Sequence, residues 1–169
     1  PYNLYKDGLK IYTTINSKLQ RYAEQAVREH LAKDLQPSFY EHWKGYTYAP
    51  FVFEDLEPDE VEAEVDKILN QTIKRSERYR KLRNTFRIMH SIRLSFNTPT
   101  EMEIFSWDGT IDTVMTPLDS IRYYKYFLHA GLMSVEPRTG FVRAYVGGID
   151  YRFFQYDHVT QGRRQVGST

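Results

Sequence analysis

Hydrophobic and polar residues alternate near the start of the chain, along residues 9–15. The apolar or β-branched face of this alternation is formed by Leu9, Ile11, Thr13 and Ile15. A period of two with this composition is typical of a half-buried strand. The pattern therefore predicts a β-strand over residues 9–15.

A helical period follows the predicted strand. Asn16 and Ser17 are both favourable N-cap residues, and Ser17 with Gln20 forms a capping-box pattern. The apolar stripe predicts a helix that ends before Pro37; its members are Leu19, Tyr22, Ala23, Ala26, Val27, His30 and Leu31. Its place on this stripe predicts that His30 is packed rather than functional.

The middle of the chain changes character twice. Residues 37–57 are rich in aromatic residues and contain prolines and a glycine, which predicts a loop packed through its aromatic rings. Pro58, followed by acidic residues, predicts the start of a second helix. The basic run from Lys74 to Arg87 predicts a third helix, either separate from the second or continuous with it.

A β-hairpin is predicted next. Residues 101–107 and 110–115 alternate on either side of Asp108-Gly109, a strong hairpin turn. A helix should follow, opened by Pro117 with Asp119 or Ser120 and closed by Gly131.

A second hairpin is predicted over residues 132–135 and 141–146, joined by a turn at residues 136–140. We expect the two hairpins to form the sheet of the C-terminal half. Strands combined with amphipathic helices predict the α+β fold class.

Composition removes several functional classes. The chain has 169 residues, a net charge of +1 and no cysteine, which excludes a disulfide framework and thiolate zinc sites. No stretch approaches the roughly 18 apolar residues of a membrane span, so a membrane anchor is expected only outside these residues. The balanced charge provides no general attraction to nucleic acid, and no nucleic-acid partner is expected. The many tyrosines favour a shallow core over an interaction surface.

The basic run from Lys74 to Arg87 permits three interpretations. It could hold phosphates or stack on bases, or it could bind an anionic cell-surface polymer. The pattern favours a solvated helix face that pairs with the acidic residues before it, because the two charges nearly balance.

Few residues suggest catalysis directly. His42, His90 and His129 lack the spacing of metal ligands, and no pair of carboxylates suits glycoside hydrolysis, so neither a metal nor a cofactor is expected. Gly167-Ser168 could place a hydroxyl at the mouth of a helix, where free backbone N–H groups favour negative charge. On its own, this pair is typical of a flexible tail.

Longer stretches give Ser168 a context. Residues 133–148, then 157–162, then Arg163-Arg164-Gln165-Val166-Gly167-Ser168 resemble the opening of the transpeptidase domain in class A penicillin-binding proteins. That family has a strand pair with a Pro-x-Thr-Gly turn, then Val-Gly-Gly, then an Arg-Gln-x-Gly-Ser segment. Residues 8–16 and the helix after them are similar to the linker that follows the family's glycosyltransferase domain.

The resemblance implies a catalytic role for Ser168. In this family the serine of Ser-x-x-Lys is acylated by the D-alanyl-D-alanine end of a peptidoglycan stem peptide or by a β-lactam, and lysine acts as its base. That lysine would stand three positions after Ser168, beyond Thr169, so this chain alone is expected to be inactive. The resemblance also implies an extracytoplasmic parent that is anchored in the membrane through residues before Pro1.

Two departures from the family pattern concern the edge of the substrate site. Tyr156-Asp157-His158-Val159 replaces a common Asn-Arg-Ala run, and Val166 replaces a frequent proline. His158 could serve as a general base for Ser168, but a turn-stabilising role is the favoured interpretation.

The predicted organisation has three parts. Residues 1–36 form an interdomain linker, 37–100 a helical insertion, and 101–169 the truncated start of a transpeptidase domain with a serine β-lactamase-like sheet. The resemblance implies a parent that polymerises glycan strands and crosslinks stem peptides. As an alternative, residues 37–100 form a non-catalytic module that positions the two catalytic domains or docks a cell-wall synthesis partner.

Overall fold

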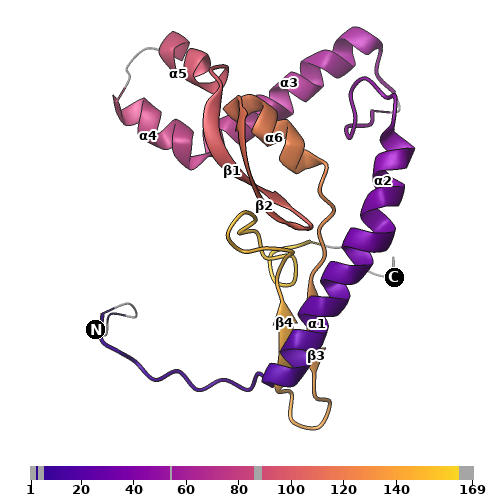
Figure 1. Ribbon diagram of the computed structural model, residues 1–169, viewed down its shortest axis with the longest axis vertical. Coiled ribbons are helices and arrows are strands. Elements are labelled where there is room, and N and C mark those ends of the chain that lie inside the picture. The colour runs from indigo at the N-terminus through magenta and orange to yellow at the C-terminus, as the bar shows by residue number, and fades with distance from the viewer. Residues whose placement is uncertain (1–2, 4–5, 54, 86–88, 164–169) are drawn as a thin grey trace. The chain divides into compact units, whose positions relative to one another are not determined.

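The computed structural model describes residues 3, 6–53, 55–85 and 89–163. The chain divides into a first unit, Pro1–His30 with His129–Thr169, and a second unit, Leu31–Leu128. Among the described residues the first unit combines one helix, and the second several helices, with a two-stranded antiparallel sheet (Figure 1), which confirms the mixture of helices and strands expected for α+β. The two sheets share no strand pairing in the described residues, so the prediction of one sheet from both hairpins is wrong. The start of a transpeptidase sheet stays a prediction.

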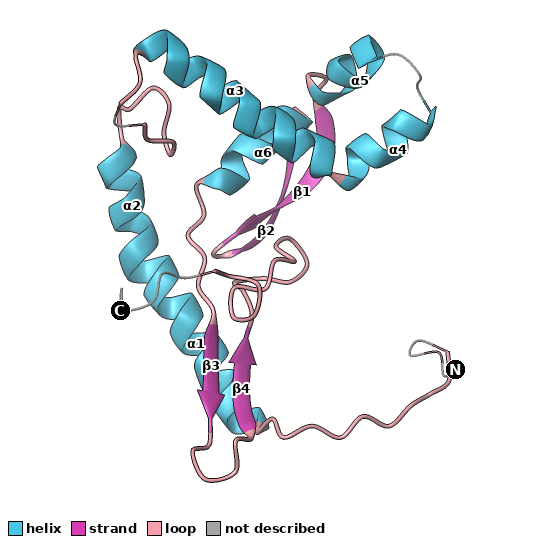
Figure 2. Cartoon of the chain, turned by 180° about the vertical axis from the view of Figure 1, so that it is seen from behind, coloured by secondary structure: helices cyan, strands magenta, loops and turns pink. Residues whose placement is uncertain are grey.

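The first unit packs one helix against one hairpin. Its elements are α1 (Ser17–His30), β3 (Leu132–Val135) and β4 (Val142–Val146). The helix contacts β4, and Figure 2 shows it running beside the hairpin. The core consists of Ala23, Ala144 and Val146, with Val27 and Leu132 packed against it. Two alanines at the centre bring the helix and strand backbones close together.

The N-terminal end of α1 is capped by Asn16. Its Oδ1 accepts the N–H groups of Lys18 and Leu19 at 3.0 and 3.2 Å. The predicted capping box of Ser17 with Gln20 is not formed, because the Gln20 side chain bonds to β4 and to Glu24 instead.

The predicted strand over residues 9–15 is wrong. The hydrogen bonds described for this segment are at its end, where Thr14 Oγ1 donates to the carbonyl of Val142 at 2.7 Å and the Thr14 carbonyl accepts from Arg143 Nη1 at 3.3 Å. The preceding residues have no strand partner in the described chain, and Tyr12 is 89% exposed. A period of two sets which side chains share a face, but a strand also needs a second backbone to pair with.

The apolar stripe of α1 is only partly buried. Ala23 is buried and Val27 half-buried, whereas Leu19 and Tyr22 are exposed. The prediction that His30 is packed is wrong, since this residue is exposed as well.

Helical backbone continues beyond the predicted end at Pro37. A π-helical turn, η1 (Leu31–Leu35), is followed by α2 (Gln36–Trp43), so the loop predicted from residue 37 begins only after Trp43. Pro37 is the second residue of α2 and follows directly on the π-helical turn. The loop after α2 packs through aromatic rings as predicted, with Trp43 and Tyr46 5.4 Å apart between ring centroids.

The second unit contains the remaining elements, which are α3 (Pro58–Arg75), α4 (Glu77–Thr85), α5 (Met89–Phe96), β1 (Thr100–Ser106), β2 (Gly109–Met115) and α6 (Pro117–Lys125). The start of α3 at Pro58 confirms the second predicted helix. The basic run is a separate helix because Ser76 is extended and its Oγ accepts the N–H of Tyr79 at 3.1 Å, capping α4. Arg78 joins α4 to α5 by donating to Ser95 Oγ at 3.2 Å.

The β1–β2 hairpin confirms the prediction, with its turn one residue earlier than expected. Ser106 pairs with Gly109, so the connecting residues are Trp107 and Asp108. Ser106 Oγ donates to the carbonyl of Gly109 at 2.7 Å, which fixes this turn.

Two tyrosines of α6 bind the backbone of β1. Tyr123 Oη donates to the carbonyl of Phe105 at 2.8 Å, and the N–H of Phe105 donates to Tyr124 Oη at 3.4 Å. The Phe127 ring lies 5.1 Å from those of Phe105 and Tyr123. Desolvation by burial raises the pKa of both tyrosines.

Gln36 joins the start of α2 to the residues that follow α6. Its Nε2 donates to the carbonyl of Tyr126 at 2.7 Å, and its Oε1 accepts the N–H of Leu128 at 3.0 Å. The side chain is 1% exposed, the most buried polar group described. The prediction that the last helix closes at Gly131 is therefore wrong: α6 ends at Lys125, and the backbone after it bonds to Gln36 instead.

Replacing Gln36 with alanine should destabilise the second unit. Gln36→Ala leaves the Tyr126 carbonyl and the Leu128 N–H without their partner in a buried place, which we expect to cost roughly 2–4 kcal/mol. Urea denaturation followed by circular dichroism measures the change. Gln25→Ala is the matched control, because the Gln25 amide is exposed and donates to Glu29 at 3.1 Å, and its loss should cost under about 0.5 kcal/mol. Equal effects of the two substitutions would contradict the role given to Gln36.

Candidate functional site

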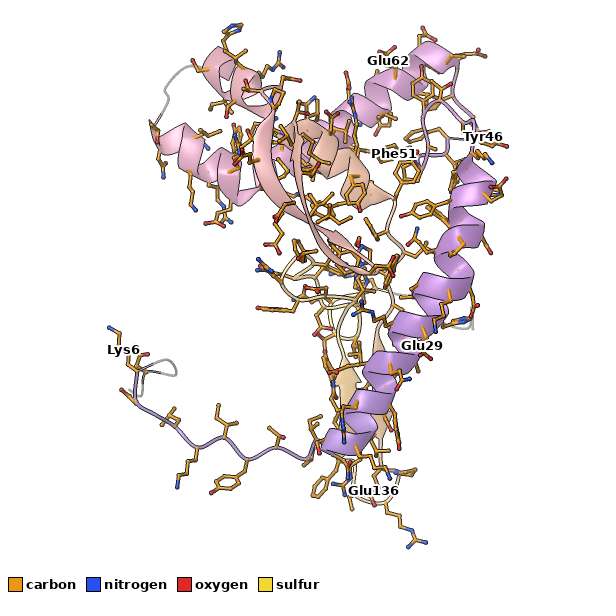
Figure 3. All side chains as sticks on the ribbon, viewed as in Figure 1. Lys6, Glu29, Tyr46, Phe51, Glu62 and Glu136 are labelled. Carbon is orange, nitrogen blue, oxygen red and sulfur yellow. The ribbon has the colours of Figure 1, made fainter. Side chains whose placement is uncertain are left out.

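The turn between β3 and β4 is held by one carboxylate. Glu136, labelled in Figure 3, accepts hydrogen bonds from Arg143 Nη2 at 2.6 Å and from Thr139 Oγ1 at 2.9 Å. Gly140 completes the turn with a φ of +71°, a conformation that favours glycine. The Arg143 hydrogen bond, followed by that of Thr139, lowers the pKa of Glu136. The predicted turn at residues 136–140 is thus confirmed.

The outer edge of β4 is satisfied by a side chain instead of a third strand. Gln20 Nε2 donates to the carbonyl of Tyr145 at 2.9 Å, and Gln20 Oε1 accepts the Tyr145 N–H at 2.8 Å. The amide thus imitates the hydrogen bonding of a neighbouring strand. This contact fixes α1 along the strand that leads into Gly147-Gly148.

Asp157 organises the loop after β4. Its Oδ1 accepts the N–H groups of Val159 and Thr160 at 2.9 and 3.2 Å, and its Oδ2 accepts Thr160 Oγ1 at 2.6 Å. The hydroxyl of Tyr145 donates to the same Oδ2. These hydrogen bonds, the Thr160 hydroxyl first and Tyr145 next, lower the pKa of Asp157 from 3.8 to about 2. A single ionised side chain therefore ties strand β4 to the turn at residues 157–161.

Two glycines allow this turn to pack closely. A Cβ on Gly162 would lie 2.7 Å from the carbonyl oxygen of His158, and one on Gly131 would lie 3.0 Å from the backbone nitrogen of Val159. The distance at Gly162 is shorter than real Cβ contacts, so the backbone there would have to shift, and the distance at Gly131 would force Val159 to move by a few tenths of an ångström. The N–H of His158 also donates to the carbonyl of Gly147 at 2.7 Å. The loop is thereby folded back onto the end of β4.

The ring of His158 is packed among other rings. It stacks on His129 with 5.0 Å between centroids and meets Tyr156 edge-on at 4.9 Å. This packing agrees with the turn-stabilising role favoured for His158. Ser168, the predicted nucleophile, and Val166 lie outside the described residues, so both assignments stay predictions.

Sequence reasoning missed the roles of Gln20 and Asp157. The Asp-x-x-Thr spacing of Asp157 and Thr160 is a signal for a side-chain-capped turn and could have identified the carboxylate. Nothing local identifies Gln20 as the partner of Tyr145, because 125 positions separate them.

The basic run does not pair with the acidic residues before it. Within the described chain, its ion pair is Lys81 with Glu77 at 2.8 Å, inside α4 itself. On α3, Lys67 pairs with Glu64 at 3.0 Å, and no ion pair joins an acidic residue of this helix to the described part of the basic run. The run is a solvated helix face as favoured, since Arg80, Lys81 and Arg83 are exposed, but the predicted pairing with the acidic residues of α3 is wrong for the described residues.

Other site classes lack their residues in the described part of the chain. No group of three or more histidine, aspartate or glutamate side chains there could hold a metal ion. Among the helices of the same residues, none is long and apolar enough to cross a membrane.

Comparisons with known proteins find similarity to penicillin-binding proteins in both units. The penicillin-binding protein middle domain family matches residues 47–128, which lie within the second unit. Penicillin-binding protein 1A of Neisseria flavescens is 27% identical over 192 aligned residues, covering 98% of this chain and 22% of the relative. Penicillin-binding protein 1A of Aquifex aeolicus is 26% identical over 97% of this chain and 22% of its own length.

A shorter alignment has higher identity. Penicillin-binding protein 2D of Bacillus subtilis is 45% identical over 42 residues, which is 25% of this chain and 6% of that protein. No solved structure matches. The chain spans 22% of the length of the two 1A relatives, so it corresponds to about a fifth of such a protein.

Acidification should loosen the loop that Asp157 organises. The pKa of Asp157 is depressed in the folded chain, so its contribution to stability is present above pH 4 and is lost as pH falls toward 2. We expect the thermal midpoint of the wild type to fall through this window and the Asp157→Asn variant to lose that part of the dependence. Amide chemical shifts of Val159 and Thr160 should report the same titration by NMR.

Asp150→Asn provides a matched control in the same loop. Asp150 accepts one described backbone hydrogen bond, from Arg152 at 2.8 Å, and it does not connect the loop to β4. This control should keep the acid transition near pH 2. If Asp157→Asn and Asp150→Asn titrate alike, Asp157 is not the organising group.

Proposed function

Because the chain belongs to the class A penicillin-binding proteins, we propose that it is the part of a cell-wall synthase that carries the middle domain and leads into the transpeptidase domain. The observation that carries this proposal is the match of residues 47–128 to the middle domain family, within an alignment to penicillin-binding protein 1A that covers nearly the whole chain. The parent would polymerise glycan strands and crosslink the stem peptides of peptidoglycan.

In this proposal Ser168 is the nucleophile of crosslinking. Its Oγ attacks the carbonyl between the two terminal D-alanines, the terminal D-alanine leaves with a proton on its amine, and an acyl-enzyme forms. An amino group of a second stem peptide then attacks the ester, which restores the serine hydroxyl. A β-lactam would acylate the same oxygen by opening its ring.

The loop before Ser168 supports this assignment through positioning. Described residues reach Arg163, five positions before the serine, and the chain up to there is held by Asp157 and Gln20. A nucleophile works only when it is held in a reactive geometry, so a well-bonded approach to Ser168 suits that role. Neither Gln20 nor Asp157 needs to touch the substrate for this.

The remaining parts of the machinery are proposed for the longer protein. The base would be a lysine three positions after Ser168, with the later Ser-x-Asn and Lys-Thr-Gly motifs and a glycosyltransferase domain also outside these residues. The synthase would work on the extracytoplasmic side of the cytoplasmic membrane, held by an anchor before Pro1. The present chain alone would have neither activity.

A second candidate role concerns the middle of the chain. The second unit has its own core. Its basic run makes no ion pair with the acidic residues of α3 in the described chain. Both features favour a module that positions the catalytic domains or docks a cell-wall synthesis partner. Such a module is non-catalytic and acts through its surface.

Penicillin labelling tests the nucleophile. A protein that extends through the lysine and the two later motifs should be labelled covalently by a fluorescent penicillin, and Ser168→Ala should abolish labelling because the attacking oxygen is gone. Gel fluorescence measures the product. Ser134→Ala, at an exposed serine of β3, should label like the wild type. Labelling that persists in Ser168→Ala would refute the assignment, and the 169-residue chain should not label.

A charge reversal tests the positioning role. Arg80→Glu with Arg83→Glu, both exposed on α4, should leave penicillin labelling of the longer protein unchanged but slow its production of crosslinked glycan. Analysis of the product by chromatography separates crosslinked from linear material. Unchanged yields of both would mean that this surface is only a spacer.

A further inference from the structure

The second unit has a groove beside α3 that no step of the proposed reaction uses. It encloses about 520 Å³ between α3 and α5, and Figure 1 shows both helices. Its floor is apolar, with Leu69 and Phe96 each 2% exposed and Ile73 half-buried. An apolar floor beneath an open groove gains free energy when another surface covers it.

The α3 side of the groove has an ordered series of polar groups. Asp66, Asn70 and Lys74 are exposed and line the groove. Because they are four residues apart, they lie on one face of the helix, and Asp66 and Lys74 are separated by about 12 Å along the axis. The series therefore runs from an acid through an amide to a cation.

These three groups are not neutralised within the described chain. Neither Asp66 nor Lys74 makes an ion pair with a described residue. Asn70 donates one hydrogen bond, to the backbone carbonyl of Asp66 at 2.8 Å, which leaves its other N–H and its amide oxygen for a partner. The α3 side of the groove therefore presents an acid, an amide and a cation in fixed order, each with groups left to bind a partner.

The order acid, amide, cation is self-complementary, because the same order read in the opposite direction places a cation against the acid and an acid against the cation. A second α3, antiparallel and related by a two-fold axis at Asn70, would place its Lys74 against Asp66 and its Asp66 against Lys74. The two Asn70 amides would meet on the axis, where amides pair as both donors and acceptors. This is the requirement for an isologous interface, in which each contact occurs twice.

We propose that this groove is the interface between two copies of the chain, which associate through antiparallel α3 helices. The Ile73 side chains and the apolar floor would be covered by the facing helix. Two symmetric ion pairs between Asp66 and Lys74 would set the register and the antiparallel direction, since a parallel arrangement brings like charges together.

The wider charge distribution favours a second copy over other occupants. The first half of α3 is acidic, with Asp59, Glu60, Glu62 and Glu64, and Figure 3 labels Glu62 there. The end of α3 and the following helix are basic, with Lys74, Arg75, Arg80 and Arg83. A uniformly anionic polymer would meet repulsion along the acidic half. An antiparallel copy would instead place the basic end of one α3, at Lys74, beside Asp66 of the other, so that opposite charges meet on both sides of Asn70.

Sedimentation equilibrium of the 169-residue chain tests the interface. The wild type should show a reversible dimer that weakens with added salt. Asp66→Lys alone and Lys74→Asp alone should each weaken it by about tenfold or more, because one substitution converts two attractive pairs into two repulsive ones. Circular dichroism should show that each variant is folded, since both side chains are exposed.

Two restorations separate the interface from general charge effects. A mixture of the Asp66→Lys and Lys74→Asp chains should form a heterodimer, because all four facing charges are then opposite in sign. The double variant D66K/K74D should dimerise with itself for the same reason. Arg75→Asp is the matched control, since Arg75 carries the same charge beside Lys74 but does not line the groove, and it should keep the dimer.

Three outcomes would overturn the proposal. They are a wild-type chain that stays monomeric at every concentration, single reversals that dimerise as well as the wild type, and a mixture of the two single variants that does not associate.

Discussion

The second unit depends on one buried amide, that of Gln36. The chain after α6 must leave the helix without leaving its carbonyl and N–H groups unpaired in the interior, and Gln36 supplies a donor for Tyr126 and an acceptor for Leu128. With these two bonds made, Phe127 can lie against Phe105 and close the core above the β1–β2 hairpin. Without them, the Tyr126 carbonyl and the Leu128 N–H would have to bind water or continue the hydrogen bonding of the helix.

A second glutamine performs the same task in the first unit. Gln20 gives the Tyr145 backbone the donor and acceptor that a third strand would otherwise supply, while the Tyr145 hydroxyl reaches Asp157. One residue of β4 is thereby connected to the helix on one side and to the loop on the other. The proposed route to Ser168 starts from this connection, so its geometry depends on groups that need not touch the substrate.

Charge is segregated along the second unit, and the described ion pairs of α3 and α4, Glu64 with Lys67 and Glu77 with Lys81, each lie within one helix. The first half of α3 is acidic, and the basic residues from Lys74 onward make no ion pair with it in the described chain. Exposed charges of one sign repel each other at short range, so such segregation adds nothing to the stability of the monomer. The segregation makes one end of this surface acidic and the other basic. Such a surface suits a domain whose proposed role is to associate and to position rather than to catalyse.

The sequence by itself determined where α3 and the two hairpins form, because caps, turns and periodicity are local. Pro58 begins α3, and the turn at Glu136–Gly140 joins β3 to β4. It also determined the family resemblance, which comparison with relatives supports. Only the tertiary structure decided which alternating segment finds a strand partner, where the helix before Tyr126 ends, and that Asp157 binds Tyr145. Each of these outcomes depends on pairing between backbone groups and side chains far apart in the chain, and local sequence patterns contain no information on such distant partners.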